Sequence, residues 1–219
     1  MLDRRKRFLA DVELPGGERV VAHLANTGRM TGCWEPGCAV RVWRSDDPKR
    51  KLAWSVEQTR VGGHWILVNT ARANAIVGEA LRDGRIAGLE GREVRPEAPF
   101  PGGGRVDFLL DGRTWVEVKN VTLLEGRRLL FPDTVSERAT RHLGELRAAV
   151  ERGERAVLLL HVGREGGEEV SAAAHIDPVW AETLAAAMEA GLEVQAWRSA
   201  LDAEGATLVE RLPFTSPGR

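Results

Sequence analysis

The chain has few cysteines and no pattern that would link them into a scaffold. Its 219 residues include only Cys33 and Cys38, and two cysteines cannot build a disulfide framework. No CxxC pair or histidine cluster accompanies them, which argues against a zinc site. We therefore expect both thiols to be reduced and partly buried.

Long apolar runs and a strong charge of one sign are also missing. No stretch is long enough to span a bilayer, and the basic start at residues 1–7 leads into a strand pattern instead of a signal-peptide segment. We expect a cytoplasmic protein without membrane contact. The net charge of −1 excludes a nucleic-acid binder of the high-pI kind.

The charges are nevertheless unevenly distributed along the chain. Residues 1–70 carry 12 Lys+Arg against 8 Asp+Glu, whereas the remainder carries 19 against 24. A basic front and an acidic back fit a protein that binds phosphate with one part and metal with the other. An asymmetry this small also fits chance.

Two carboxylates and a lysine stand in an otherwise apolar hairpin pattern. Residues 105–119 read as two strands around an Asp-Gly turn, and they contain Asp107, Glu117 and Lys119. Unpaired charges are expensive to bury, so a cation between the two acids would explain their presence. A divalent metal ion that assists phosphodiester hydrolysis is the corresponding hypothesis.

The length of the turn decides whether the acids meet. Glu117 and Lys119 share a strand face because side chains alternate. A two-residue turn at Asp111-Gly112 would put Asp107 and Glu117 on opposite faces, whereas a loop that also includes Arg113 brings them together, with glycine in the left-handed conformation. We predict this three-residue register.

The residue types suggest distinct chemical roles. The oxygens of Asp107 and Glu117 would hold Mg²⁺ or Mn²⁺, which polarises a phosphate and lowers the pKa of an attacking water. Lys119 would orient that water or stabilise developing negative charge. A Glu117–Lys119 ion pair on a solvated sheet face, with Asp107 as a second surface acid, is the competing interpretation, and these three residues alone leave both open.

The first 70 residues read as short strands separated by turns. We predict five strands, at residues 7–14, 19–25, 38–44, 52–59 and 65–68. Five short strands with basic edges favour an OB-like barrel. The basic residues that could bind phosphate here are Arg4, Arg5, Lys6, Arg7, Arg29 and Arg41, together with Arg44 and the run at 49–51.

Tryptophans and the basic run have simpler explanations as well. Trp34, Trp43, Trp54 and Trp65 could offer stacking surfaces for bases. Core filling is the interpretation that we favour for most of them. The run at residues 49–51 fits a solvated loop as well as a binding patch.

The remaining residues alternate helix and strand signals, which is typical of an α/β domain on a mixed sheet. Predicted helices span residues 71–82, 137–152 and 178–190, with caps at Thr70, at the capping-box sequence 134–137 and at Asp177. A buried strand is predicted at 155–162, and final strands at 192–199 and 206–212. We predict two domains, 1–69 and 70–219.

Several blocks resemble the sugar fermentation stimulation protein A (SfsA) family. They are residues 4–14, 22–30 and 116–123, with further matches at Asn69-Thr70, Asn74, 105–110, 131–133 and His142-Leu143. The resemblance implies a bacterial or archaeal DNA-binding protein with an OB-like domain and a C-terminal domain of the PD-(D/E)XK nuclease type. It also implies a role in regulating sugar metabolism genes.

The resemblance assigns roles to individual residues of the second domain. Asp107 matches the first acid of the nuclease motif, and Glu117 and Lys119 match its E-x-K. Glu79 falls where many such nucleases have an extra acid, so the implied metal ligands are Asp107, Glu117 and Glu79; a solvated helix position explains Glu79 equally well. Val106 stands where the motif name has proline.

The next helix carries the implied substrate contacts Arg138, Arg141 and His142. Family members usually have Arg-Gly and Lys-His in this segment, whereas this chain has Arg138-Ala139 and Arg141-His142. The charge is kept, but the lost glycine puts a close backbone approach to substrate in doubt.

The sequence therefore predicts a cytoplasmic DNA-binding protein with a Mg²⁺- or Mn²⁺-dependent nuclease site. A non-enzymatic DNA-binding regulator with a vestigial site is the main alternative, although no helix-turn-helix pattern is visible. An OB-type adaptor for other proteins is another. The sequence leaves three questions open: whether the ligand is DNA or RNA, whether it is single- or double-stranded, and whether the protein is a monomer or a homodimer.

Overall fold

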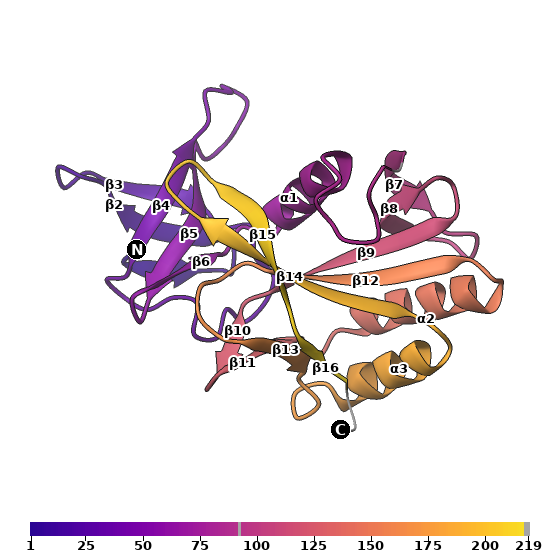
Figure 1. Cartoon of the computed structure of the whole chain (residues 1–219). Helices are drawn as coiled ribbons and strands as arrows, with labels where there is room; N and C mark the ends of the chain where they lie inside the picture. The colour runs from indigo at the N-terminus through magenta and orange to yellow at the C-terminus, as the bar shows by residue number, and fades with distance from the viewer. Residues whose placement is uncertain (92, 217–219) are drawn as a thin grey trace.

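The computed structural model describes residues 1–91 and 93–216, which form two parts lying side by side (Figure 1). The N-terminal part is a six-stranded sheet in the order β1-β2-β3-β5-β4, with β6 paired to β5. Its strands are β1 (Asp3–Arg5), β2 (Leu9–Glu13), β3 (Arg19–His23), β4 (Ala39–Arg44), β5 (Trp54–Val61) and β6 (His64–Leu67). The five predicted strands are all present, so the interpretation of this region as β structure is confirmed.

The prediction missed β1. Its basic residues pair with β2 across a tight turn, with Arg4 opposite Ala10. A three-residue strand made of charged side chains carries no alternation of apolar and polar positions, which explains why the pattern did not reveal it.

A core of aliphatic and sulfur-containing side chains fills the N-terminal part. Leu24, Met30, Val56 and Ile66 are fully buried in it. Both cysteines are free and buried, as predicted. Trp34 and Trp54 pack against this core and Trp65 packs against a neighbouring one, whereas Trp43 is exposed.

The C-terminal part is built on a mixed six-stranded sheet in the order β15-β14-β12-β9-β8-β7. The central strands β9, β12 and β14 are parallel, and the outer pairs are antiparallel. The strands are β7 (Val94–Pro99), β8 (Arg105–Leu110), β9 (Thr114–Val121), β12 (Arg155–Val162), β14 (Glu193–Leu201) and β15 (Ala206–Leu212). The predicted mixed sheet is confirmed.

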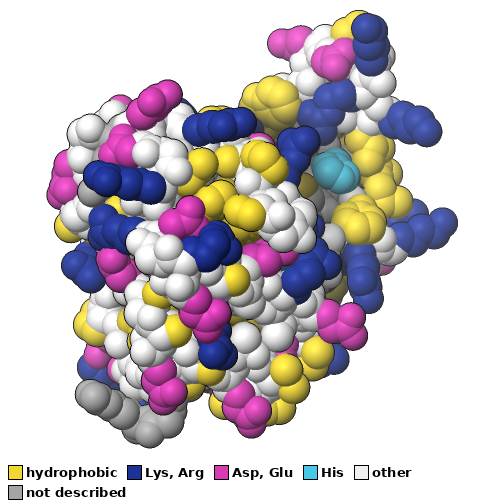
Figure 2. All heavy atoms as spheres, turned by 90° about the vertical axis from the view of Figure 1, so that its right-hand side faces the viewer, with side chains coloured by type: hydrophobic (Ala, Val, Ile, Leu, Met, Phe, Trp, Pro, Cys, Tyr) yellow, Lys and Arg dark blue, Asp and Glu magenta, His cyan; other side chains and the backbone are white. Residues whose placement is uncertain are grey.

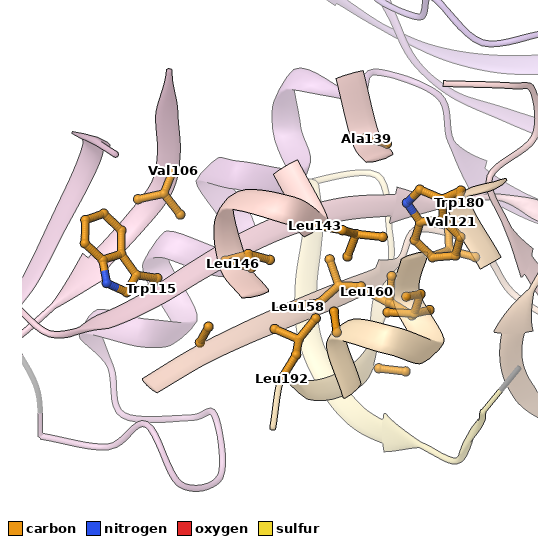
Figure 3. Packing of buried hydrophobic residues seen from close by; sticks show 14 of the residues in the cluster. Val106, Trp115, Val121, Ala139, Leu143, Leu146, Leu158, Leu160, Trp180 and Leu192 are labelled. Atoms are coloured by element: carbon orange, nitrogen blue, oxygen red, sulfur yellow. The ribbon is translucent and has the colours of Figure 1, made fainter. Parts of the chain in front are cut away.

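Helices cover both faces of this sheet (Figure 1). Helix α1 (Ala71–Arg82) lies on one face, and α2 (Glu137–Glu151) and α3 (Pro178–Glu189) lie on the other. Side chains of β12 alternate between the two cores: Val157 and Leu159 pack with α1, whereas Leu158 and Leu160 pack with α2 and α3 (Figure 3). A strand buried on both faces needs the continuous apolar run that the sequence contains.

A second, smaller sheet lies beside the first. It consists of β10 (Leu123–Glu125), β11 (Arg128–Phe131), β13 (Glu169–Ala172) and β16 (Phe214–Thr215), in the order β10-β11-β13-β16. The sequence patterns did not predict this sheet. Strands of two to four residues are too short to show a period, so only their partners in the folded chain define them.

Helix starts follow the predictions in part. Asp177 caps α3, because its Oδ1 accepts a hydrogen bond from the Trp180 amide at 3.0 Å. Thr70 does not cap α1 through its side chain; its hydroxyl donates to the carbonyl of Ala25, and Asn69 Oδ1 accepts from the first helical amide instead. The cap of α2 is Ser136, two residues later than the predicted capping box requires.

The described helices are all short. None of them combines the length and the apolar character that crossing a lipid bilayer requires. The predicted boundary between residues 69 and 70 stays a prediction; β6 ends at Leu67 and α1 begins at Ala71.

Candidate active site

The β8–β9 hairpin brings Asp107 and Glu117 to neighbouring positions. Leu110 pairs with Thr114, so the loop between them has three residues, of which Gly112 has a φ of 68°. The predicted register and the left-handed glycine are both confirmed. Asp107 directly precedes Phe108 and Glu117 directly follows Val116, the residues of the pair farthest from the loop.

Glu117 is a buried carboxylate with an asymmetric environment. Only 2% of the residue is exposed. Its Oε1 accepts hydrogen bonds from Lys119 Nζ and from Nδ1 of His142 on α2. Burial alone would raise the pKa of Glu117, but the His142 hydrogen bond and the Lys119 charge outweigh it and lower that pKa. Glu117 is therefore ionised at neutral pH.

Asp107 is half-buried and bound on both oxygens. Its Oδ1 accepts from Asn74 Nδ2 on α1 at 2.7 Å, and its Oδ2 accepts from the Val118 amide at 2.7 Å. Burial, followed by the negative charge of Glu117, raises the pKa of Asp107. The two acids thus have environments that push their pKa values apart, a pattern that is typical of functional sites.

The donor groups suit a hard divalent cation. No trio of His, Cys, Asp or Glu side chains among the described residues is arranged to hold a metal ion. Glu117 Oε2, however, is a buried carboxylate oxygen without a hydrogen-bond partner, which is costly unless a cation compensates it. Two carboxylates completed by water and phosphate oxygens form a ligand set that Mg²⁺ accepts. The residues therefore fit such an ion.

A polar cleft of about 320 Å³ opens next to this cluster. Residues 26–28 of the N-terminal part form one wall, and residues of α1, β9 and the segment before α2 form the others. Lys119 lines the cleft with 15% of its side chain exposed, and Asn74 lines it from α1. Lys119 and Asn74 thus connect the cluster to a cleft that both parts of the chain build.

Arg4 does not have the phosphate-binding role that the sequence predicted. Its guanidinium donates to four main-chain carbonyls at 3.0–3.2 Å, those of Arg7, Asn26, Gly28 and Arg29. All its donor nitrogens are therefore engaged in holding the loop that forms a wall of the cleft. The prediction is corrected: Arg4 shapes the cleft, because distant carbonyls converge on it in the fold.

The other predicted N-terminal contacts fall into three groups. Arg5 is paired with Asp11. Lys6, Arg7 and Arg29 are exposed near the loop that Arg4 holds, with Lys6 and Arg7 in a left-handed turn. Arg41 lies elsewhere: it donates to Gln58 Oε1 at 2.7 Å and stacks 3.9 Å from the centre of the Trp65 ring, along a different groove.

The predicted nucleic-acid contacts on α2 also differ in where their side chains lie. Arg138 is exposed and lines the cleft, and Arg141 is exposed with its Nε 3.9 Å from Glu145 Oε1. His142 is buried and bonded to Glu117, so the predicted contact to nucleic acid is corrected to an internal one. Three positions after the buried Ala139, position 142 lies on the inward face of the helix, whereas Arg138, in the first turn, and Arg141 are exposed.

Glu79 is not part of the cluster, which corrects its prediction as a metal ligand. It is exposed and forms an ion pair with Arg85 at 2.9 Å. Asn74 is the residue of α1 that reaches Asp107. Five helical positions separate the two, and this spacing directs Glu79 away from the acids and toward the other groove.

Sequence reasoning missed the roles of Asn74 and Asp133. Asn74 was among the residues that resemble the SfsA family, but that resemblance assigned it no role. Asp133 lines the cleft, and its Oδ2 accepts from the Met30 amide at 3.4 Å. A Cβ atom at Gly28 would lie 2.5 Å from that same oxygen, so glycine is required for this close approach between the two parts.

These observations define a two-domain protein in which an OB domain adjoins a mixed α/β domain with an Asp–Glu–Lys cluster at the junction. Residues 2–68 match the SfsA N-terminal OB domain, and residues 71–205 match the sugar fermentation stimulation protein RE domain. The chain belongs to the SfsA family, as the sequence blocks predicted.

Bacterial relatives are similar over nearly the whole chain. A sugar fermentation stimulation protein homolog of Geobacter sulfurreducens is 46% identical over 97% of this chain and 93% of its own length. Another, from Pseudoalteromonas atlantica, is 48% identical over 98% and 94%. The similarity therefore extends over the residues matched by both domain models.

A solved structure has the same fold. The SfsA protein of Pyrococcus furiosus, determined in complex with Ca²⁺, superimposes with a TM-score of 0.88 at 24% identity, covering 98% of this chain and 93% of that one. At this identity the likeness establishes the fold.

Proposed function

We propose that this protein binds DNA and hydrolyses its phosphodiester bonds with Mg²⁺ or Mn²⁺. The observation that carries the proposal is the cluster of Asp107, Glu117 and Lys119 beside a polar cleft between the two domains. The Ca²⁺ complex of the archaeal relative supports a divalent-metal site in this fold. Free, buried cysteines fit the reducing cytoplasm, where we propose that the protein acts.

Asp107 and Glu117 would hold the metal ion. Asn74 and the Val118 amide orient the first carboxylate, and His142 orients the second. A bound divalent cation supplies a polarised phosphate and a water that ionises near neutral pH. The free Glu117 oxygen is the donor that burial leaves available for it.

Lys119 would act on the reacting groups. Its ammonium is held by Glu117, and the residue lines the cleft. From there it can donate to an attacking water or to a phosphate oxygen as negative charge develops. Because it is positioned before substrate arrives, little reorganisation is needed during the reaction.

Exposed basic residues around the cleft would attract the DNA backbone. Arg138 lines the cleft, and Lys6, Arg7 and Arg29 are exposed near the wall that Arg4 holds. Contacts of this type provide affinity that depends on salt and tolerates sequence. The cluster of Asp107, Glu117 and Lys119, and not these basic contacts, would then determine which phosphodiester bond is cleaved.

The test is cleavage of plasmid and linear DNA in Mg²⁺ and in Mn²⁺. We expect wild-type protein to cut, EDTA to abolish cutting, and Asp107→Asn or Glu117→Gln to reduce the rate at least a hundredfold. Glu182→Gln, which changes an exposed carboxylate on α3, serves as the matched control and should cut normally. Wild-type protein that cuts no substrate with either metal would refute the nuclease proposal.

A DNA-binding regulator without nuclease activity is the second candidate. The observation that favours it is that Glu117 Oε1 is already bonded to both Lys119 and His142, and that the described residues hold no trio of His, Cys, Asp or Glu side chains arranged for a metal ion. In that case DNA affinity should be the same in EDTA and in Mg²⁺. Asp107→Asn should then bind DNA as the wild type does.

A further inference from the structure

The strand β4 carries an exposed tryptophan between arginines. Trp43 is 47% exposed, and every other tryptophan of the chain is buried or half-buried. The Arg50 guanidinium lies 5.5 Å and that of Arg72 lies 5.9 Å from the centre of the Trp43 ring. Together with Arg44, the next residue of β4, they form what we call the Trp43 surface.

The two arginines are held in place by other side chains. Arg50 Nη2 donates to Ser55 Oγ at 2.9 Å, and Arg72 Nε donates to Glu57 Oε2 at 2.9 Å. Holding these long side chains in advance reduces the entropy that a ligand would have to overcome. The surface is therefore preorganised around an aromatic ring that still has access to solvent.

The surroundings of Trp43 differ on its two sides. The β4–β5 loop carries Lys49, Arg50 and Lys51 after the acids Asp46 and Asp47, and Figure 2 shows dark-blue and magenta side chains on the part that projects at the top of the molecule. Toward α1 lies a groove of about 580 Å³ that Trp43 helps to line, together with acids such as Glu79 and the turn at 202–205. A phosphate would avoid the acids, whereas the donor groups of a base could face them.

We propose that the Trp43 surface binds an unpaired nucleotide of a single strand, with its base stacked on Trp43 and its phosphates along Arg44 and the β4–β5 loop. Aromatic stacking combined with a basic track is the recurrent way of binding single strands. Bases within a duplex are already stacked and cannot use the indole face. The groove volume is that of an ordinary small-ligand site.

This inference rests on nucleic acid being the ligand of the proposed function, and it names which form is bound. Arg41 and Arg72 line the same groove, whereas Lys119 of the acidic cluster lines the other cleft; helix α1 contributes residues to both. The Trp43 surface would thus hold a single-stranded segment away from the reacting phosphate.

The experiment measures binding by fluorescence anisotropy in EDTA at constant salt, with no cleavage required. The probes are a labelled oligothymidylate of twelve nucleotides, an abasic strand with the same number of phosphates, and a twelve-base-pair duplex. We expect the wild type to prefer the thymidylate over the abasic strand by about 5- to 150-fold, the range for stacking of one base. The wild type should also bind the thymidylate more tightly than the duplex.

The variants separate stacking from bulk and charge. Trp43→Leu keeps an apolar side chain without a π face and should bind both single strands equally; Trp43→Phe should recover most of the preference. Val21→Ala, an exposed apolar position on β3, is the matched control and should behave as the wild type. Melting curves establish that each variant is folded.

Three results would overturn the inference. They are equal binding of thymidylate and abasic strands by the wild type, unchanged preference in folded Trp43→Leu, and a preference for duplex. The nuclease proposal is judged separately: cleavage with normal thymidylate binding in Trp43→Leu refutes only the stacking site. Trp43-dependent binding without any cleavage refutes only the nuclease.

Discussion

His142 on α2 donates through Nδ1 to Oε1 of Glu117 on β9, and both side chains are buried. A helix and a strand 25 positions apart in the chain are thereby joined at the proposed metal site. Partners of metal ligands typically control ligand orientation and basicity. The contact gives His142 a positioning role that does not require it to touch substrate.

We therefore expect His142→Phe, which keeps a ring of similar bulk without the hydrogen bond, to bind Mn²⁺ about 10- to 100-fold more weakly than the wild type. Titration calorimetry measures this directly. His142→Gln, which keeps a donor, should lose less. The control is His175→Gln, at an exposed histidine whose Nε2 lies 3.2 Å from Glu125; unchanged Mn²⁺ affinity in folded His142→Phe would contradict the role.

Asp107 is expected to destabilise the metal-free protein as pH rises. Burial and the charge of Glu117 raise its pKa in the folded state above the ordinary value of 3.8, so the folded state holds this proton more tightly than the unfolded state. The free energy of unfolding then falls as pH rises from about 3.8 through the raised pKa. Asp107→Asn removes that penalty.

Thermal melts in EDTA between pH 3.5 and pH 8 test this sign. The melting temperature of Asp107→Asn relative to wild type should increase with pH and then level off. Glu182→Gln should show no such trend, because its carboxylate is exposed. A difference that shrinks with increasing pH would show that Asp107 is stabilised in its charged form.

Arg4 is expected to matter for stability more than for DNA affinity. Arg4→Ala leaves four carbonyls without their donor and should cost about 1–3 kcal/mol of unfolding free energy. Arg4→Lys should restore little, because an ammonium cannot reproduce the planar fork. Denaturant titration provides the measurement.

Arg5→Ala is the comparison for Arg4. Arg5 neighbours it on β1, but its exposed pair with Asp11 should contribute little to stability. Equal losses of stability in Arg4→Ala and Arg5→Ala would show that the carbonyl contacts of Arg4 are unimportant.

His161 is a buried neutral histidine, and it should make the protein sensitive to acid. Its Nδ1 and Nε2 lie 2.8 Å from Asn120 Oδ1 and from Ser199 Oγ, and burial lowers its pKa from 6.5 to about 4. Because the unfolded state takes up the proton first, stability should fall by about 3 kcal/mol as pH falls from 6.5 to 4.

Nuclear magnetic resonance of the imidazole protons tests this expectation without a mutation. The His161 ring should not titrate above pH 5 in the folded protein. A His161 signal that shifts near pH 6.5 would mean that the ring is accessible to solvent and contributes no such acid sensitivity.

Local patterns in the sequence were sufficient for most of the fold. The helices, the long strands and the apolar β12 follow from periodicity, because each pattern is contained within one element. The register of the Asp107–Glu117 hairpin could be predicted because a three-residue loop and strand alternation are local too. The shortest strands escaped prediction because two to four residues hold no period.

The sequence of the hairpin therefore determined which chemical groups form the site and approximately how they are arranged. The environment of each charge was decided elsewhere: Arg4 meets carbonyls from residues 26–29, His142 turns inward to Glu117, and Glu79 turns away to Arg85. Each of these partners depends on how segments distant along the chain pack together. A charged residue type therefore specifies what a side chain can bind, and only the folded arrangement specifies whether that capacity is used internally or left open to a ligand.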